Sequence, residues 1–85
     1  MQQQPPSPEY EARLRGILEA NDWQALREFS REQNQVPEDV YNKDDHFWQV
    51  LMHKIICNRL DTLALHERSR KWLADNGYTA DLGGY

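Results

Sequence analysis

The chain has 85 residues and little that would stabilise a small protein beyond its own core. Its single cysteine excludes a disulfide within the chain. It has no apolar run long enough to span a bilayer, and its first residues lack the basic and then apolar order of a secretion signal. We therefore expect a reduced, cytoplasmic domain that does not enter a membrane. A core of this size rarely contributes more than about 3–5 kcal/mol of stability.

Positive charge is also scarce. The net charge is −4, and residues 1–45 carry ten acidic side chains against five basic ones. Proteins that bind duplex DNA usually show a basic excess, because phosphate neutralisation supplies most of their affinity. Nucleic acid is thus a disfavoured partner. The basic stretch from Arg59 to Lys71 still leaves one alternative function, a small DNA-binding or transcription-regulatory protein.

Compact catalytic motifs are missing as well. The sequence contains no glycine-rich phosphate loop and no calcium-loop pattern. Its paired carboxylates, at 38–39 and 44–45, fall in a polar loop or at a helix start, where solvation and the helix dipole account for them. We predict a protein that is not an enzyme and needs no cofactor.

What the sequence does contain is a series of helix signals. Ser7 followed by Pro8 predicts a helix start, and an apolar side chain then recurs at every third or fourth position. Asn21 and Asp22 predict a tight joint to a second helix over 23–33. The two helices should form an αα-hairpin.

A polar connection of about a dozen residues follows the hairpin. Within it Pro37 predicts a single helical turn through Tyr41, with Val36 and Val40 packed on the core. Beyond the connection, residues 46–76 contain neither glycine nor proline.

The stretch 46–76 is compatible with one long helix or two. The helical spacing of the apolar residues is interrupted near 63–65, which favours two helices. The second would be capped by Asp61 and would end at Gly77. The predicted fold class is all-α, a small three- to four-helix bundle made of an αα-hairpin, a polar connection, a central apolar helix and a C-terminal helix. We expect a disordered tail over 1–6, a single domain over 7–78 and a C-terminal tail over 79–85.

The central helix, around residues 46–60, is apolar over most of its circumference. Such a helix is either surrounded by its own chain or shared with a partner. Few residues are available to surround it, so we predict a non-catalytic protein-interaction module that self-associates through it as a homodimer or binds another protein. The candidate interface residues are Phe47, Trp48, Leu51, Met52 and Ile55.

The same helix carries His46, His53 and Cys57 within about 40° of one another. Imidazole and thiolate both bind zinc, so His53 and Cys57, with His66 as a further ligand, define a second alternative, a metal-binding or thiol protein. However, His46 and His53 are two turns apart, about 10 Å, which is too far to share an ion. We therefore favour a structural role for these side chains and predict no metal.

Overall fold

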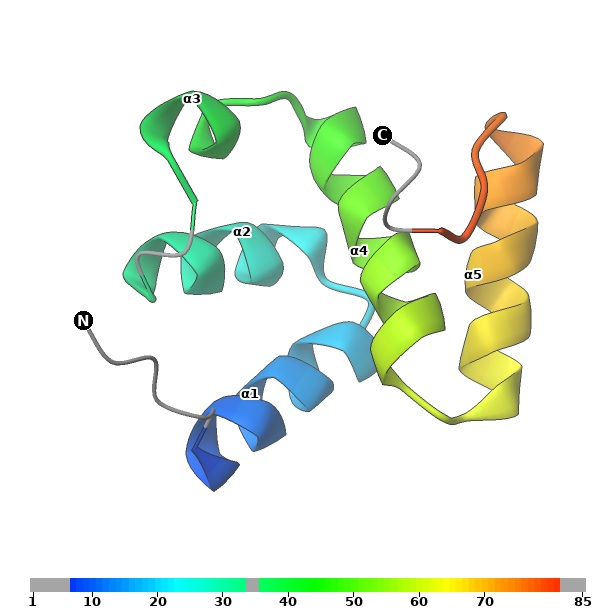
Figure 1. Ribbon diagram of the computed structural model, residues 1–85, viewed down its shortest axis with the longest axis horizontal. Coiled ribbons are helices and arrows are strands. Elements are labelled where there is room, and N and C mark those ends of the chain that lie inside the picture. Colours follow the sequence, from blue (N-terminus) through cyan, green and yellow to red (C-terminus); the bar gives the residue numbers. More distant parts are fainter. Residues whose placement is uncertain (1–6, 34–35, 82–85) are drawn as a thin grey trace.

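The computed structural model describes residues 7–33 and 36–81, and this part of the chain is all-helical (Figure 1). The tail at 1–6 and the end of the chain at 82–85 lie outside the described residues, so the predictions for them are not tested. The helices are α1 (Pro8–Glu19), α2 (Trp23–Glu32), α3 (Glu38–Tyr41), α4 (Asp45–Arg59) and α5 (Leu63–Asp75). The predicted all-α small bundle is confirmed. None of these helices is long and apolar enough to cross a membrane.

Side-chain caps begin the first, second and fourth helices where the sequence predicts them. Ser7 Oγ accepts from the Tyr10 backbone N–H at 3.1 Å, which satisfies a donor that the first turn of α1 leaves free. Asp22 caps α2 and Asp44 caps α4 through the same kind of bond. Asn21, at φ 57°, makes the left-handed turn between α1 and α2.

The stretch 46–76 forms two helices, as the apolar pattern favours. Leu60 takes an extended conformation after α4, and α5 begins at Leu63. The prediction that Asp61 caps α5 is wrong: Thr62 occupies that position and its side chain makes no capping bond. The Asp61 carboxylate instead lies near the Arg15 guanidinium of α1, at 3.8 Å.

Gly77 ends α5 as predicted. Its φ of 84° is readily adopted only by glycine, and it turns the chain so that the Tyr78 N–H donates to the Leu73 carbonyl at 2.8 Å. The segment after this turn lies against α4, where Asn58 donates to the Ala80 carbonyl at 2.8 Å. The first residues of the predicted C-terminal tail over 79–85 are therefore bound to α4.

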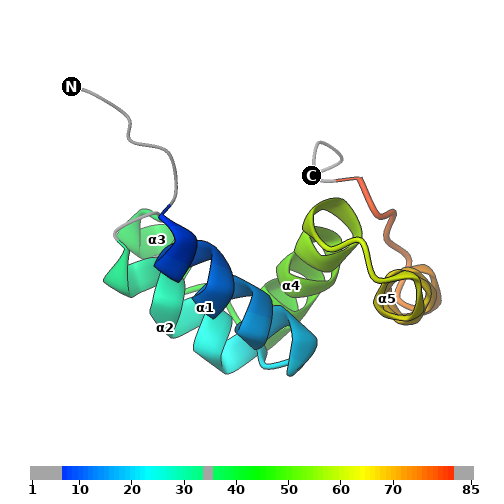
Figure 2. The ribbon, with the colours of Figure 1, turned by 90° about the horizontal axis from the view of Figure 1, so that it is seen from below.

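α4 lies between the α1–α2 hairpin on one side and α5 on the other (Figures 1 and 2). The main core fills the space between α4 and the hairpin, and Val36 and Val40 pack against it as predicted. Its buried members are Leu14, Leu18, Leu26, Phe29, Trp48, Met52, Ile56 and Leu60. The opposite side of α4 forms a separate contact with α5.

Candidate functional site

The structure divides the predicted interface residues into two groups. Trp48 and Met52 are 0% and 1% exposed and lie in the core against the hairpin. They are therefore not available to a partner in this fold. Phe47, Leu51 and Ile55 pack at the edge of the same core and are only partly buried. The sequence did not separate the groups because a helix that is apolar all round does not show which side its own chain covers.

Phe47, Leu51 and Ile55 are spaced by four residues, so they follow one another along a single side of α4. We call these three side chains the α4 strip. All three side chains are only partly buried, although they pack at the edge of the core.

The histidine and cysteine side of α4 faces α5. His53 is 4% exposed, its Nδ1 shares a hydrogen bond of 2.8 Å with Ser69 Oγ, and its ring stacks on Trp72 with centroids 4.4 Å apart. Cys57 Sγ lies 3.9 Å from the His66 carbonyl oxygen. Each side chain has its own partner in α5, so the two do not converge on a shared point.

The remaining histidines are also engaged separately. His46 is exposed, and its Nε2 lies 3.3 Å from the Tyr78 hydroxyl. His66 Nε2 contacts the Leu60 carbonyl oxygen in the turn between α4 and α5. Within residues 7–33 and 36–81, no three side chains of the metal-binding types gather at one place.

Burial sets the protonation of His53 and Cys57. It lowers the pKa of His53 to about 4, with a further contribution from the Arg68 guanidinium, so the imidazole is neutral near pH 7. Burial also raises the pKa of the Cys57 thiol, although Arg70 acts in the opposite direction. Since the thiolate is the reactive form, Cys57 is a poor nucleophile in this setting.

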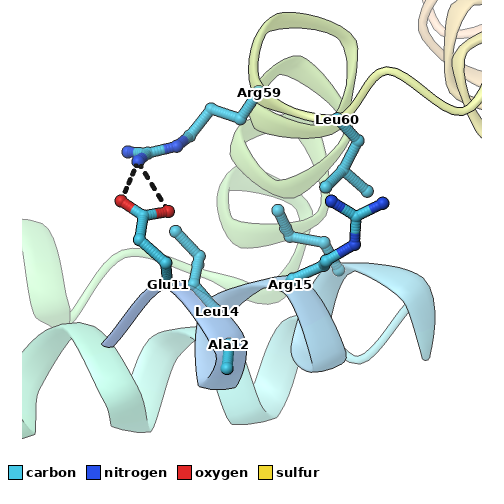
Figure 3. A pocket seen from close by; sticks show the side chains of 7 residues that line it. Glu11, Ala12, Leu14, Arg15, Arg59 and Leu60 are labelled. Carbon is cyan, nitrogen blue, oxygen red and sulfur yellow. Dashed lines mark hydrogen bonds and ion pairs between the residues drawn. The ribbon is translucent and has the colours of Figure 1, made fainter. Parts of the chain in front are cut away.

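A hollow of about 180 Å³ lies between α1 and the end of α4 (Figure 3). Its cationic side chains already have acidic partners: Arg59 donates to both Glu11 carboxylate oxygens, at 2.9 and 3.2 Å, and Arg15 donates to Glu19 at 3.2 Å. This hollow therefore offers no unmatched charge to a ligand. It is lined by Glu11, Ala12, Leu14, Arg15, Leu18, Arg59 and Leu60.

A second hollow, of about 270 Å³, lies between α5 and the α1–α2 joint, and we call it the α5 hollow. It is lined by Asn21, His53, Arg68, Lys71, Trp72 and Asp75. Lys71 Nζ donates to Asp75 at 3.1 Å, whereas Arg68 forms no ion pair with any residue that the structure places. A third hollow, with a wall formed by Phe47 and Val50, lies beside Tyr78 at the start of α4.

The basic residues between Arg59 and Lys71 do not share one face. Arg59 reaches across to Glu11 of α1, while Arg68 and Lys71 line the α5 hollow. Arg70 lies on the opposite flank of α5, where its charge acts on Cys57. This arrangement gives the DNA-binding alternative no support, because a recognition helix directs several such side chains at one groove.

Comparison of the chain with protein-family models, with curated proteins and with solved structures finds no match. The functional argument therefore depends on the site geometry.

Proposed function

We propose that this chain is a small non-catalytic interaction module that self-associates through the α4 strip. The observation that carries the proposal is the position of Phe47, Leu51 and Ile55. They form a line of partly exposed apolar side chains along the one helix that the rest of the chain packs around.

A second copy of the chain suits this strip for two reasons. The core is small and has no disulfide to reinforce it, so further apolar burial adds a large fraction to its stability. A strip along one helix can also meet the same strip of a second copy across a two-fold axis, which sets each α4 against its mate. Three partly buried side chains make a small interface, so we expect a weak dimer.

The thiol chemistry is consistent with a reducing compartment such as the cytoplasm, which we propose as the location. Cys57 is half-buried against α5, and its raised pKa keeps it as the thiol.

The test is the mass in solution, measured by sedimentation from micromolar to millimolar concentration. The wild-type chain should approach twice the chain mass at the upper end. Leu51→Glu should stay monomeric, because a carboxylate in the strip would be desolvated without a partner. Far-UV circular dichroism should show that the variant is still helical.

Leu63→Glu is the matched control. Leu63 is 69% exposed at the start of α5, is not part of the strip, and receives the same substitution. This variant should dimerise as the wild type does. A wild-type chain that stays folded and monomeric at millimolar concentration contradicts the proposal, and so does a Leu51→Glu variant that dimerises normally.

A further inference from the structure

The α5 hollow has an aromatic wall. The His53 ring stacks on the Trp72 indole at 4.4 Å and 25° between planes, and the hydrogen bond to Ser69 fixes the imidazole. Trp72 is only partly buried and lines the hollow, and no described residue accepts a hydrogen bond from its indole nitrogen. The Trp72 ring, held in place by His53, therefore offers an aromatic surface to a flat ligand in the hollow.

The charge at the rim is positive and not fully compensated. Of the three charged side chains that line the hollow, Asp75 and Lys71 form an ion pair with each other. The Arg68 guanidinium is the third, and it has no ion-pair partner among the described residues. The neighbouring imidazole is neutral near pH 7, so it adds no second cation. A guanidinium presents paired N–H groups that match a carboxylate, which would supply the partner that Arg68 lacks.

We propose that the α5 hollow binds a small planar aromatic carboxylate, with its ring against Trp72 and its carboxylate on Arg68. The volume of about 270 Å³, just below the usual range for ligand sites, suits a ligand of one or two fused rings. The hollow and the α4 strip share no residue, so this proposal does not depend on self-association.

Indole-3-acetate is the first probe, compared with indole-3-acetamide, which has the ring without the charge, and with acetate, which has the charge without the ring. The readout is the indole N–H resonance of each tryptophan in a ¹⁵N NMR titration. The Trp72 resonance should shift and saturate with indole-3-acetate at millimolar concentration or below. The Trp48 resonance should not move, because that side chain is enclosed in the core. The amide and acetate should bind at least about tenfold more weakly.

Arg68→Gln and Arg70→Gln form a matched pair, since both remove one positive charge from an exposed position of α5. Arg68→Gln should weaken binding of indole-3-acetate about tenfold, because it removes a charge-assisted hydrogen bond. Arg70→Gln, on the other flank, should bind as the wild type does, and so should Leu51→Glu, which isolates this test from dimerisation.

Three results would overturn the proposal. The first is a Trp72 resonance that does not move at indole-3-acetate concentrations up to about 10 mM. The second is equal weakening in Arg68→Gln and Arg70→Gln, which would mean a general charge effect. The third is equal binding of indole-3-acetamide, which would leave the guanidinium without a role.

Discussion

The two sides of α4 bury very different chemistry. Toward the hairpin, Trp48, Met52 and Ile56 meet Leu26 and Phe29 in an apolar interface. Of the buried side-chain nitrogen and oxygen atoms in the described part of the chain, only Trp48 Nε1 lacks a hydrogen-bond partner. An unsatisfied donor costs about 1–3 kcal/mol, so the apolar area that this indole buries must outweigh that cost.

Toward α5, the same helix relies on specific polar contacts. His53 is held by Ser69 and Trp72. The next residue, Lys54, is only 1% exposed and donates to the Asp81 carbonyl at 3.1 Å. Apolar packing supplies most of the free energy of folding but accepts many geometries, whereas a buried hydrogen bond accepts few. The comparison indicates that the hairpin side provides stability and the α5 side fixes how α5 is placed.

The largest expected effect is on the hairpin side. Met52→Ala removes a fully buried side chain and leaves a cavity, so it should lower the free energy of unfolding by about 2–5 kcal/mol. That range is comparable with the whole stability expected for a core of this size, so much of the variant should be unfolded at 25 °C. Urea unfolding, monitored by circular dichroism, measures this loss of stability. Leu63→Ala, at an exposed apolar residue, should change stability by less than about 0.5 kcal/mol. Equal stability of the two variants would refute the tight packing of Met52.

The next effect is on the α5 side and depends on pH. The folded-state pKa of His53 is about 4, below the ordinary value of about 6.5. Between these values the unfolded chain binds a proton that the folded chain does not. Stability should therefore fall as the pH falls from about 6.5 to about 4, by at most about 3 kcal/mol from this group. Below that range this contribution stays constant.

Urea midpoints across this pH range test the His53 prediction. His53→Gln should flatten the decline, because glutamine does not titrate. The carboxylates of the chain are present in every variant, so the difference between variants isolates the imidazole. His46→Gln, at an exposed position of the same helix, should keep the slope of the wild type. From α5, the Arg68 guanidinium acts on His53, and Lys71 and Asp75 line the same hollow. If His53→Gln and wild type decline in parallel, the imidazole is not buried neutral.

Much of the fold could be predicted from the sequence because its helix boundaries depend on neighbours in the chain. Ser7, Asp22 and Asp44 cap helices through bonds to residues three positions later, and Gly77 supplies a conformation that other residues resist. The break between α4 and α5 is the weakest boundary. It has no side-chain cap, so the change in the apolar pattern is the one valid signal, and the capping residue expected there, Asp61, makes no such bond.

The candidate site was harder to predict because burial is a tertiary property. Nothing local distinguishes Met52, which the hairpin covers, from Leu51, which it leaves partly open. The same limit applies to Lys54, a charged residue within the apolar central helix that is 1% exposed and donates to the Asp81 carbonyl. Ser69 offered one usable signal: it lies midway between Leu65 and Leu73 at helical spacing, which places it on the buried face of α5.

The smallest predicted effect compares two buried serines. Ser69 is 0% exposed and bonds to His53, whereas Ser30, 8% exposed in α2, has no side-chain hydrogen bond to any residue the structure describes. Alanine favours a helix interior by up to about 0.5 kcal/mol over serine, so Ser30→Ala should be neutral or slightly stabilising. Ser69→Ala gains the same amount but leaves His53 Nδ1 buried without a partner, which costs about 1–3 kcal/mol. The net result should be a loss of about 1 kcal/mol or more in the free energy of unfolding measured with urea.

The stability difference between Ser30→Ala and Ser69→Ala should shrink when each is made in the His53→Gln background, because Ser69 no longer has the imidazole as its partner there. If Ser30→Ala and Ser69→Ala unfold at the same urea concentration, the polar contact does not hold α5, and packing of Leu73 and Trp72 alone must place that helix.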